Sequence, residues 1–261
     1  MTANFFWIGV IGAVLLGGCA SSYYNLATQR EEWVFYSTDQ EVNMGRKIAK
    51  QLEKQMKVLD DQAAQDRIAA IGRKLAAVSN RKELLYDFKV LDLKEVNALS
   101  LPGGMVYVNR GLLEKVGSDD ELAGVLAHEI GHLEARHAMK RLQASMGYSL
   151  LQALAVGTRM DPRAIRGATI AFTQLYLAYS RGDELQADHL GVKLLQRAGY
   201  DPYAMERFLR RLKDIHRNDL TPFAYLRTHP YLSDRIRVVH ETIEGKLRFE
   251  DYINIEEDTL Q

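Results

Sequence analysis

The segment His128–His132 contains two histidines and a glutamate with the residue types and spacing of a metal-dependent hydrolytic site. The segment reads His-Glu-Ile-Gly-His, so Glu129 directly follows the first histidine. On a helix, side chains four residues apart project from one face, and both imidazoles can therefore reach one zinc ion. Glu129 lies about 100° round the helix, where it can hold the attacking water and act as general base. The alternative is a helix with two hydrogen-bonded core histidines, which would need several dedicated polar partners.

The residues before this segment predict that it lies in the middle of a helix. Ser118 is followed three residues later by Glu121, which is the spacing of a capping box. The acidic first turn also suits the positive end of a helix, so we expect the helix to begin near Asp119. Apolar residues then recur at helical spacing, which places both histidines within the helix: Leu122, Val125, Leu126 and Ile130.

A second acidic segment can supply a third ligand. Glu184 and Asp188 are four residues apart, so Glu184 can ligate zinc while Asp188 accepts the second ring N–H of a ligating histidine. Two histidines and one glutamate leave a fourth position open for water, as in catalytic zinc sites. Asp183 is a competing carboxylate, and Glu184 could also be a solvated side chain. Spacing alone leaves this choice open.

His229 is a further candidate ligand, because Pro230 stiffens the turn that carries it. A lone histidine near a turn is more often structural, so both interpretations stay open. His137 does not complete a metzincin pattern. That pattern needs glycine and histidine where the chain has Ala135 and Ala138, and His137 is one residue out of register.

Three short segments before this helix have the composition of strands. Tyr86–Val90 alternates apolar and polar residues, and Val96–Leu99 and Met105–Val108 are two further candidates. Leu101–Gly104, between the last two, is a turn whose glycines permit a close backbone approach. We therefore expect a small sheet beside the metal-binding helix.

One of these strands can bind a substrate. A strand beside an active site can pair with an extended peptide along its edge without demanding a particular sequence. We expect four consecutive residues to form this substrate-binding edge: Gly104, Met105, Val106 and Tyr107. The alternative is an ordinary hairpin without such a function.

The remaining segments predict a helical scaffold around one core. Amphipathic spacing indicates helices at Val42–Leu52 and Asp60–Val78, and later ones at Asp201–His216 and Ser233–Glu244. The 261 residues are enough to bury a full core without a structural metal. Lys plus Arg and Asp plus Glu number 34 each, so the net charge is zero and nothing favours nucleic acid. We expect protein or peptide substrates.

The amino-terminal residues predict export and a lipid anchor. Phe5–Gly18 is an uninterrupted run of apolar residues and glycine, which suits a signal-peptide core and is short for a membrane span. The single cysteine, Cys19, follows in a sequence that resembles a bacterial lipobox, so we expect it to carry lipid and anchor the chain to a membrane. Ala20, in place of an aspartate, follows the cysteine, and in this the chain resembles lipoproteins that are sorted to the outer membrane. The alternatives are an uncleaved anchor or cleavage at another small residue, because no Lys or Arg precedes the run.

Several motifs occur in a fixed order along the chain. The central three are His128-Glu129-x-x-His132, then Ser180-Arg181-x-x-Glu184-x-x-Ala187-Asp188, then Thr228-His229-Pro230 with Arg235-Ile236. Before them come Asn97-Ala98, Leu101-Pro102-Gly103-Gly104 and Gly111-Leu112-Leu113. This set resembles the zinc metallopeptidases of family M48, which include periplasmic and often lipid-anchored enzymes. The resemblance covers roughly residues 40 to 245.

The resemblance implies roles for individual residues. It implies Glu184 as the third zinc ligand and Asp188 as the partner of a ligating histidine. It implies His229 either as a further, switchable ligand that keeps the enzyme latent or as a group that steadies the oxyanion. Arg235 is a second candidate for a hydrogen bond to the oxyanion.

Two residues depart from the family pattern. His189 stands where an arginine is common, and Gln186 stands where glutamate or alanine is usual. Neither change removes a chemical group that the predicted reaction needs.

The resulting prediction is one mostly helical α+β domain of the minimal gluzincin (zincin-like) type. We expect a signal peptide over residues 1–18, a lipidated polar tether over 19–30 with helix from Glu31 onward, the peptidase domain over 31–246 and an acidic tail over 247–261. The expected function is a zinc endopeptidase that cleaves misfolded or unassembled proteins on the periplasmic side of a bacterial outer membrane. The alternative is a proteolytically latent, zinc-bound chaperone or assembly factor for outer-membrane proteins.

Overall fold

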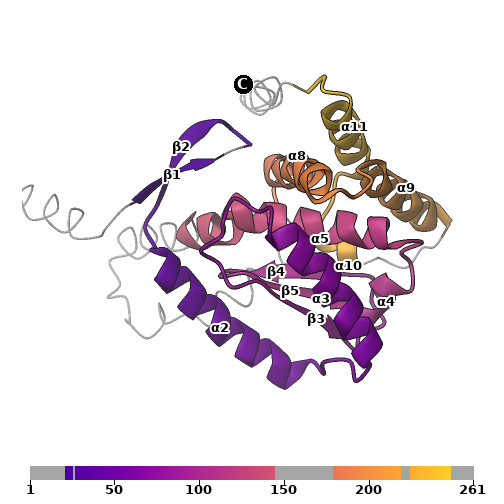
Figure 1. Ribbon diagram of the computed structural model, residues 1–261, viewed down its shortest axis with the longest axis horizontal. Coiled ribbons are helices and arrows are strands. Elements are labelled where there is room, and N and C mark those ends of the chain that lie inside the picture. The colour runs from indigo at the N-terminus through magenta and orange to yellow at the C-terminus, as the bar shows by residue number, and fades with distance from the viewer. Residues whose placement is uncertain (1–20, 26, 145–178, 219–223, 248–261) are drawn as a thin grey trace, which may run out of the picture.

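The fold is arranged around one buried helix, α5 (Asp119–Glu134). The computed structural model describes four stretches of the chain: residues 21–25, 27–144, 179–218 and 224–247. In Figure 1, α5 has a sheet on one side and helices α8 (Arg181–Ala198) and α9 (Tyr203–Asn218) on the other. Nearly all of α5 is buried, so the helix with the two histidines is the centre of the core. The predicted mostly helical α+β class is confirmed.

Parts of the predicted domain organisation lie outside the described residues. These are the signal peptide, Cys19 and residues 248–261 of the acidic tail. In the described part of the chain, no helix combines the length and the apolar character that a membrane span requires.

The sheet beside α5 has three strands in the order β3-β5-β4: β3 (Asp87–Leu91), β5 (Met105–Asn109) and β4 (Ala98–Leu101). β5 runs parallel to β3 and antiparallel to β4. All three predicted strands are present, each shifted by no more than two residues at either end. The four-residue helix α4 (Arg110–Leu113) follows β5 directly.

The strand order corrects the predicted peptide-binding edge. Gly104, Met105, Val106 and Tyr107 were expected at an edge, but β5 is the central strand and its backbone pairs on both sides. An incoming peptide cannot add to a strand whose two edges are already hydrogen-bonded. Among the strands that the structure describes, β4 pairs only with β5 and also packs against α5. The edge beside the metal-binding helix is therefore β4.

Two amphipathic helices cover the sheet, α2 (Thr38–Gln55) and α3 (Gln62–Ala76). Ser37 begins α2 through a capping box, and Asp61 caps α3. The turn between β4 and β5 packs tightly on α2, since a Cβ on Gly45 would lie 1.6 Å from the Pro102 carbonyl oxygen. These contacts confirm the two predicted helices and the close backbone approach at the glycine turn.

The segment before α2 forms a hairpin, which corrects the predicted tether and the helix from Glu31. Strand β1 (Ser21–Asn25) pairs antiparallel with β2 (Arg30–Val34). The side chain of Asn25 in β1 donates to Glu32 Oε1 in β2 at 2.8 Å, which supports the pairing, and α2 begins only where Ser37 can cap it. The turn of the hairpin packs on the body of the domain through a buried contact of Ala27 with Ala135 and Leu190.

The last described helices complete the core on the far side of α5. Gly199 ends α8 in the left-handed conformation, with φ of 71°. After α9 come the short helix α10 (Ala224–Thr228) and α11 (Leu232–Ile243). α11 packs on both α8 and α9, so the helices that follow the predicted third ligand form one layer.

Candidate metal centre

The start of α5 explains why its histidines face the interior. The Ser118 side chain accepts the N–H of Glu121, which confirms the predicted cap and the helix start at Asp119. The Glu121 carboxylate accepts the N–H of Gly117 and pairs with Arg211, so the reciprocal half of the capping box is replaced by a neighbouring contact. The helix is thus fixed at its first turn, and His128 and His132 follow at positions that face α8.

Helices α5 and α8 approach each other to backbone contact. A Cβ added to Gly131 would lie 2.5 Å from the Ala187 carbonyl oxygen, and one added to Gly191 would lie 3.2 Å from the backbone of Ala127. No larger residue fits at Gly131 without a backbone shift. This close crossing brings the first turn of α8, with Glu184, against the two histidines.

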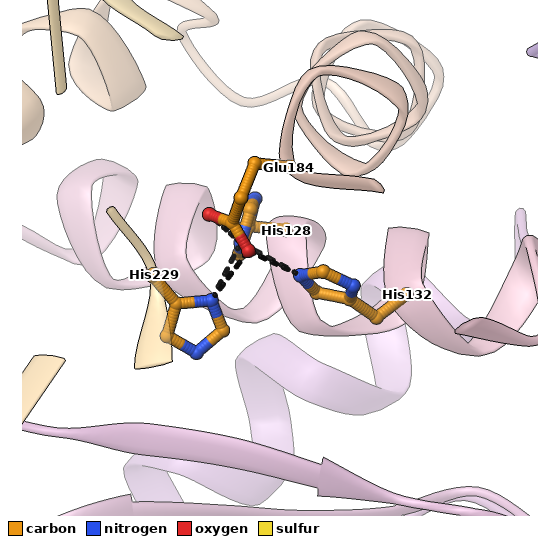
Figure 2. Close-up of side chains that lie close together, drawn as sticks. All are labelled: His128, His132, Glu184 and His229. Atoms are coloured by element: carbon orange, nitrogen blue, oxygen red, sulfur yellow. Dashed lines mark hydrogen bonds and ion pairs between the residues drawn. The ribbon is translucent and has the colours of Figure 1, made fainter. Parts of the chain in front are cut away.

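Four predicted residues meet in one buried cluster: His128, His132, Glu184 and His229. One possible ligand atom from each lies within 4.8 Å of all the others. Glu184 Oε1 lies 3.3 Å from His132 Nε2 and 3.0 Å from His229 Nδ1, as Figure 2 shows. The competing Asp183 instead closes the capping box of α8. The structure therefore favours Glu184 over Asp183 as the third ligand.

The donor set and the buried carboxylates fit a bound divalent metal. Imidazole nitrogen and carboxylate oxygen are the ligands of catalytic zinc sites. Both oxygens of Glu129 are buried and accept no hydrogen bond from the described residues. Such a carboxylate costs free energy unless a cation or a water molecule satisfies it. The alternative of two satisfied core histidines leaves this carboxylate unexplained.

Asp188 and Arg235 hold the ligands from behind. Asp188 Oδ1 lies 2.8 Å from His128 Nδ1, so it accepts that ring N–H and leaves Nε2 free for a metal. The guanidinium of Arg235 donates to both oxygens of Asp188, at 2.8 Å each, and lies 3.0 Å from Glu184 Oε2. Arg235 is fully buried by these contacts. This geometry supports a role in positioning the ligands and differs from the predicted hydrogen bond to an oxyanion.

The charges in the cluster set the protonation of the ligands. Burial disfavours ionised Glu184, but His229, Arg235 and His128 outweigh it and hold the pKa of Glu184 well below its usual value. Burial holds the pKa of His132 well below its usual value, so its imidazole is neutral and offers a lone pair. Both groups are thus in the form that ligates metal.

His229 comes from a different part of the chain and is held among the other ligands. It follows α10, whose Tyr225 donates its backbone N–H to Val96 O at 3.0 Å. The ring of Tyr225 stacks on His229 with centroids 4.7 Å apart. Burial disfavours the imidazolium of His229, yet Glu184 and Glu129 raise its pKa above the usual value. The structure thus brings the predicted His229 to the cluster.

His137 is a residue of this site that the sequence analysis missed. Its Nδ1 lies 2.8 Å from His132 Nδ1, and its Nε2 lies 3.2 Å from Gln186 Oε1. The amide oxygen of Gln186 can only accept, so His137 carries its proton on Nε2 and accepts the N–H of His132 on Nδ1. This leaves His132 Nε2 free for a metal. The sequence offered two signals: a histidine shortly after the metal-binding helix, and a glutamine at position 186 where glutamate or alanine is usual.

Two further contacts enclose this side of the site. The ring of Tyr179 stacks on His132, with centroids 3.9 Å apart. The side chain of Asn25, from the amino-terminal hairpin, donates to Gln186 Oε1 at 3.3 Å and to Glu32 Oε1 at 2.8 Å. The hairpin is thus hydrogen-bonded to Gln186, which contacts His137, the residue that orients His132.

Comparison with known proteins adds an independent observation. The profile of Peptidase family M48 matches residues 62–243. The chain is 30% identical over 209 residues to the beta-barrel assembly-enhancing protease of Yersinia pestis, which covers 77% of this chain and 43% of that protein. It is 32% identical over 208 residues to a putative beta-barrel assembly-enhancing protease of Vibrio cholerae, covering 76% and 43%. It is 34% identical over 177 residues to the mitochondrial metalloendopeptidase OMA1 of Arabidopsis thaliana, covering 68% and 36%. The match thus spans less than half the length of each of these three relatives.

Proposed function

The chain belongs to peptidase family M48, and from this premise we propose that it is a zinc-dependent endopeptidase. The observation that carries the proposal is the carboxylate of Glu129. Both of its oxygens are buried and accept no hydrogen bond from the described residues, and it lies 3.5 Å from His229 of the four-residue cluster. A closed structural zinc site has no use for such a base.

We propose that His128, His132 and Glu184 hold the metal. Zinc in such a site lowers the pKa of a water molecule and polarises the carbonyl of a peptide bond. Glu129 then takes the proton of the attacking water and delivers it to the leaving amine, which is general acid–base catalysis by one carboxylate. Asp188 and His137 keep the two imidazoles in the tautomers that present Nε2 to the metal.

His229 is proposed to regulate access to the fourth position. Its Nδ1 lies 3.0 Å from Glu184 Oε1 and 3.3 Å from His128 Nε2, among the ligand atoms. A fourth protein ligand would occupy the position that the attacking water needs. The other ring nitrogen, Nε2, lies 3.5 Å from Glu129, so neither nitrogen of His229 is left to bind an oxyanion. This geometry favours the latent interpretation of His229 over the oxyanion interpretation.

The proposed substrates are unfolded or unassembled proteins of the bacterial envelope. An extended segment can pair along β4, beside α5, through backbone hydrogen bonds that do not depend on sequence. The envelope location rests on the predicted signal peptide and the proposed lipid at Cys19, with the outer membrane as the proposed site. The names of two of the relatives, which describe enhancement of β-barrel assembly, are consistent with such a location.

The second candidate function is a latent assembly factor that binds zinc without cleaving protein. The position of His229 among the ligands is the observation that favours it. An assembly factor of this kind would tolerate Glu129→Gln, whereas a peptidase would not.

The test is cleavage of casein by the mature chain with one equivalent of zinc, comparing the wild type with Glu129→Gln and His229→Ala. We expect cleavage by the wild type or by His229→Ala, and Glu129→Gln should lower the rate by about a hundredfold or more. Activity in His229→Ala alone would identify a latent enzyme. Silence of the wild type and of His229→Ala would exclude the peptidase and favour the assembly factor, and full activity of Glu129→Gln would refute the assigned base.

A further inference from the structure

One face of the amino-terminal hairpin carries a group of exposed aromatic side chains. Tyr24 is 56% exposed, Trp33 is 63% exposed, and Phe35, directly after β2, is 62% exposed. The register pairs Tyr24 with Glu31 and Ser22 with Trp33. Residues directly opposite each other and alternate residues share a face, so Tyr24 and Trp33 lie on the same side of the hairpin. We call these two residues, together with Phe35 just beyond the end of β2, the aromatic face.

The hairpin is fixed to the domain by its other face and by its turn. The hydroxyl of Tyr23 donates to the Ala135 carbonyl oxygen at 2.9 Å, and Asn25 donates to Gln186 on α8. Ala27 in the turn is buried against α5 and α8. The aromatic face therefore has a set orientation relative to the metal centre.

The position of the predicted lipid relates this face to a membrane. Ser21 pairs with Val34, so the start of β1 and the end of β2 lie together at the open end of the hairpin. Trp33 and Phe35 flank Val34 at this end. Cys19 precedes Ser21 by two residues, so about 7 Å of chain at most separates them. Any lipid on Cys19 would hold the open end of the hairpin at the membrane surface.

The residue types match that environment. Tryptophan and tyrosine favour the boundary between lipid headgroups and acyl chains, where the ring is in apolar surroundings and its N–H or O–H remains solvated. A lipid at one point ties the chain to the membrane without fixing the orientation of the domain, and a second contact at the interface fixes that orientation. Exposed apolar groups that gather on one face commonly mark an interaction site.

We propose that Tyr24, Trp33 and Phe35 insert into the lipid–water interface next to Cys19. The lipid and the aromatic face together then hold the domain in one orientation on the membrane. The proposal rests on the proposed lipid anchor and is independent of the proposed peptidase activity.

The chain offers its own probe for this contact. It contains two tryptophans, Trp7 in the predicted signal peptide and Trp33. In the full chain with Trp7→Phe, Trp33 is the sole tryptophan whether or not the signal peptide is removed. The purified protein is reconstituted in vesicles of phosphatidylethanolamine and phosphatidylglycerol, with and without bromine on the acyl chains. We expect Trp33 emission to shift to shorter wavelength in vesicles and to lose intensity in the brominated ones.

Variants test whether the whole face takes part. Tyr24→Ser and Phe35→Ser should weaken the quenching of Trp33 and reduce the shift. Leu85→Ser is the matched control, because Leu85 is 71% exposed and lies outside the hairpin, and it should leave both unchanged. Casein cleavage by the same variants should equal that of the parent, which reports on the peptidase separately.

Unshifted, unquenched Trp33 in a protein whose Cys19 lipid is confirmed by mass spectrometry would overturn the proposal. Shielding of Trp33 only after addition of a second protein would also overturn it. If Cys19 carries no lipid, the anchor proposal fails by itself. Added vesicles that still quench Trp33 would then support the aromatic face, and vesicles that do not would refute it.

Discussion

Two glutamates of helix α5, five residues apart and both buried, have opposite surroundings. Glu134 accepts the hydroxyl of Ser79 at 2.8 Å, the backbone N–H of Asn80 at 2.7 Å and the side-chain amide of Asn80 at 3.1 Å. Glu129 accepts no hydrogen bond from the described residues on either oxygen. Both carboxylates are buried, and only Glu134 has hydrogen-bond donors among the described residues.

The difference separates a structural carboxylate from a functional one. A buried charge with its full set of donors stabilises the fold around it. A buried charge without donors destabilises the free protein and persists where a ligand or a reaction needs it. The burial of Glu129 at the metal centre therefore lowers the stability of the free protein, whereas the hydrogen bonds to Glu134 raise it.

The same substitution at the two positions gives the sharpest test of this contrast. Glu129→Gln should reduce the rate of peptide cleavage by about 10²–10⁴-fold, because it removes the general base. Its unfolding free energy without metal should change little, because no hydrogen bond is lost and the lost attraction to His229, 3.5 Å away, is offset by the lower cost of burying a neutral group. Steady-state cleavage and urea unfolding in the presence of a chelator measure the two quantities. A large loss of stability in this variant would remove the contrast.

Glu134→Gln should show the reverse pattern. An amide in place of the carboxylate keeps one oxygen for Ser79 and the Asn80 backbone but turns its NH₂ group toward the side-chain amide of Asn80, which should lower the unfolding free energy by about 1 to 3 kcal/mol. Cleavage per folded molecule should stay within a factor of two or so. Urea unfolding followed by an activity assay well below the transition checks both, and an equal loss of activity in the two variants would argue against separate roles.

His137 extends the contrast to the ligands themselves. His137→Phe removes the acceptor for the His132 ring N–H and should weaken zinc binding by about 10- to 100-fold. His137→Gln keeps an acceptor oxygen and should recover part of the affinity. Zinc competition against a chelator measures this directly, with His189→Asn as the control for the loss of a buried histidine. Equal affinity in His137→Phe and the wild type would show that His137 only packs beside the site.

The smallest expected effect belongs to His189, a buried histidine on α8 away from the metal. Burial and the nearby Lys193 lower the pKa of His189 from 6.5 to about 4. The unfolded chain therefore takes up a proton that the folded chain refuses, and stability falls as the pH drops below 6.5. Between pH 6.5 and about pH 5.5 this costs about 1 kcal/mol. Thermal unfolding of wild type and His189→Asn across this window checks it, and parallel curves would contradict it.

Sequence patterns predicted the site better than its surroundings, for physical reasons. Helical spacing fixes which side chains share a face, so His128 and His132 could be placed together from local periodicity. Spacing left Asp183 as an alternative to Glu184, and the resemblance to family M48 was needed to choose Glu184 and Asp188. The order of strands depends on contacts between distant segments, and β5 was therefore assigned to an edge when it is central. The hairpin was missed because its polar residues, such as Asn25 and Glu32, bond to the domain and to each other, which no local pattern reveals. His137 was missed because its partner is a neighbouring histidine instead of the metal.

The backbone contact between α5 and α8 has a consequence for how the protein is made. His132 and Glu184 are separated by about fifty residues, so the chain must close a long loop before the third ligand meets the first two. Closure is stabilised by the fit of Gly131 against Ala187, a contact that involves no ligand atom. The helices can therefore dock before any ion arrives, and an unfolded chain carries only a weak two-histidine site. Binding of a metal at this site is thereby coupled to folding of the chain.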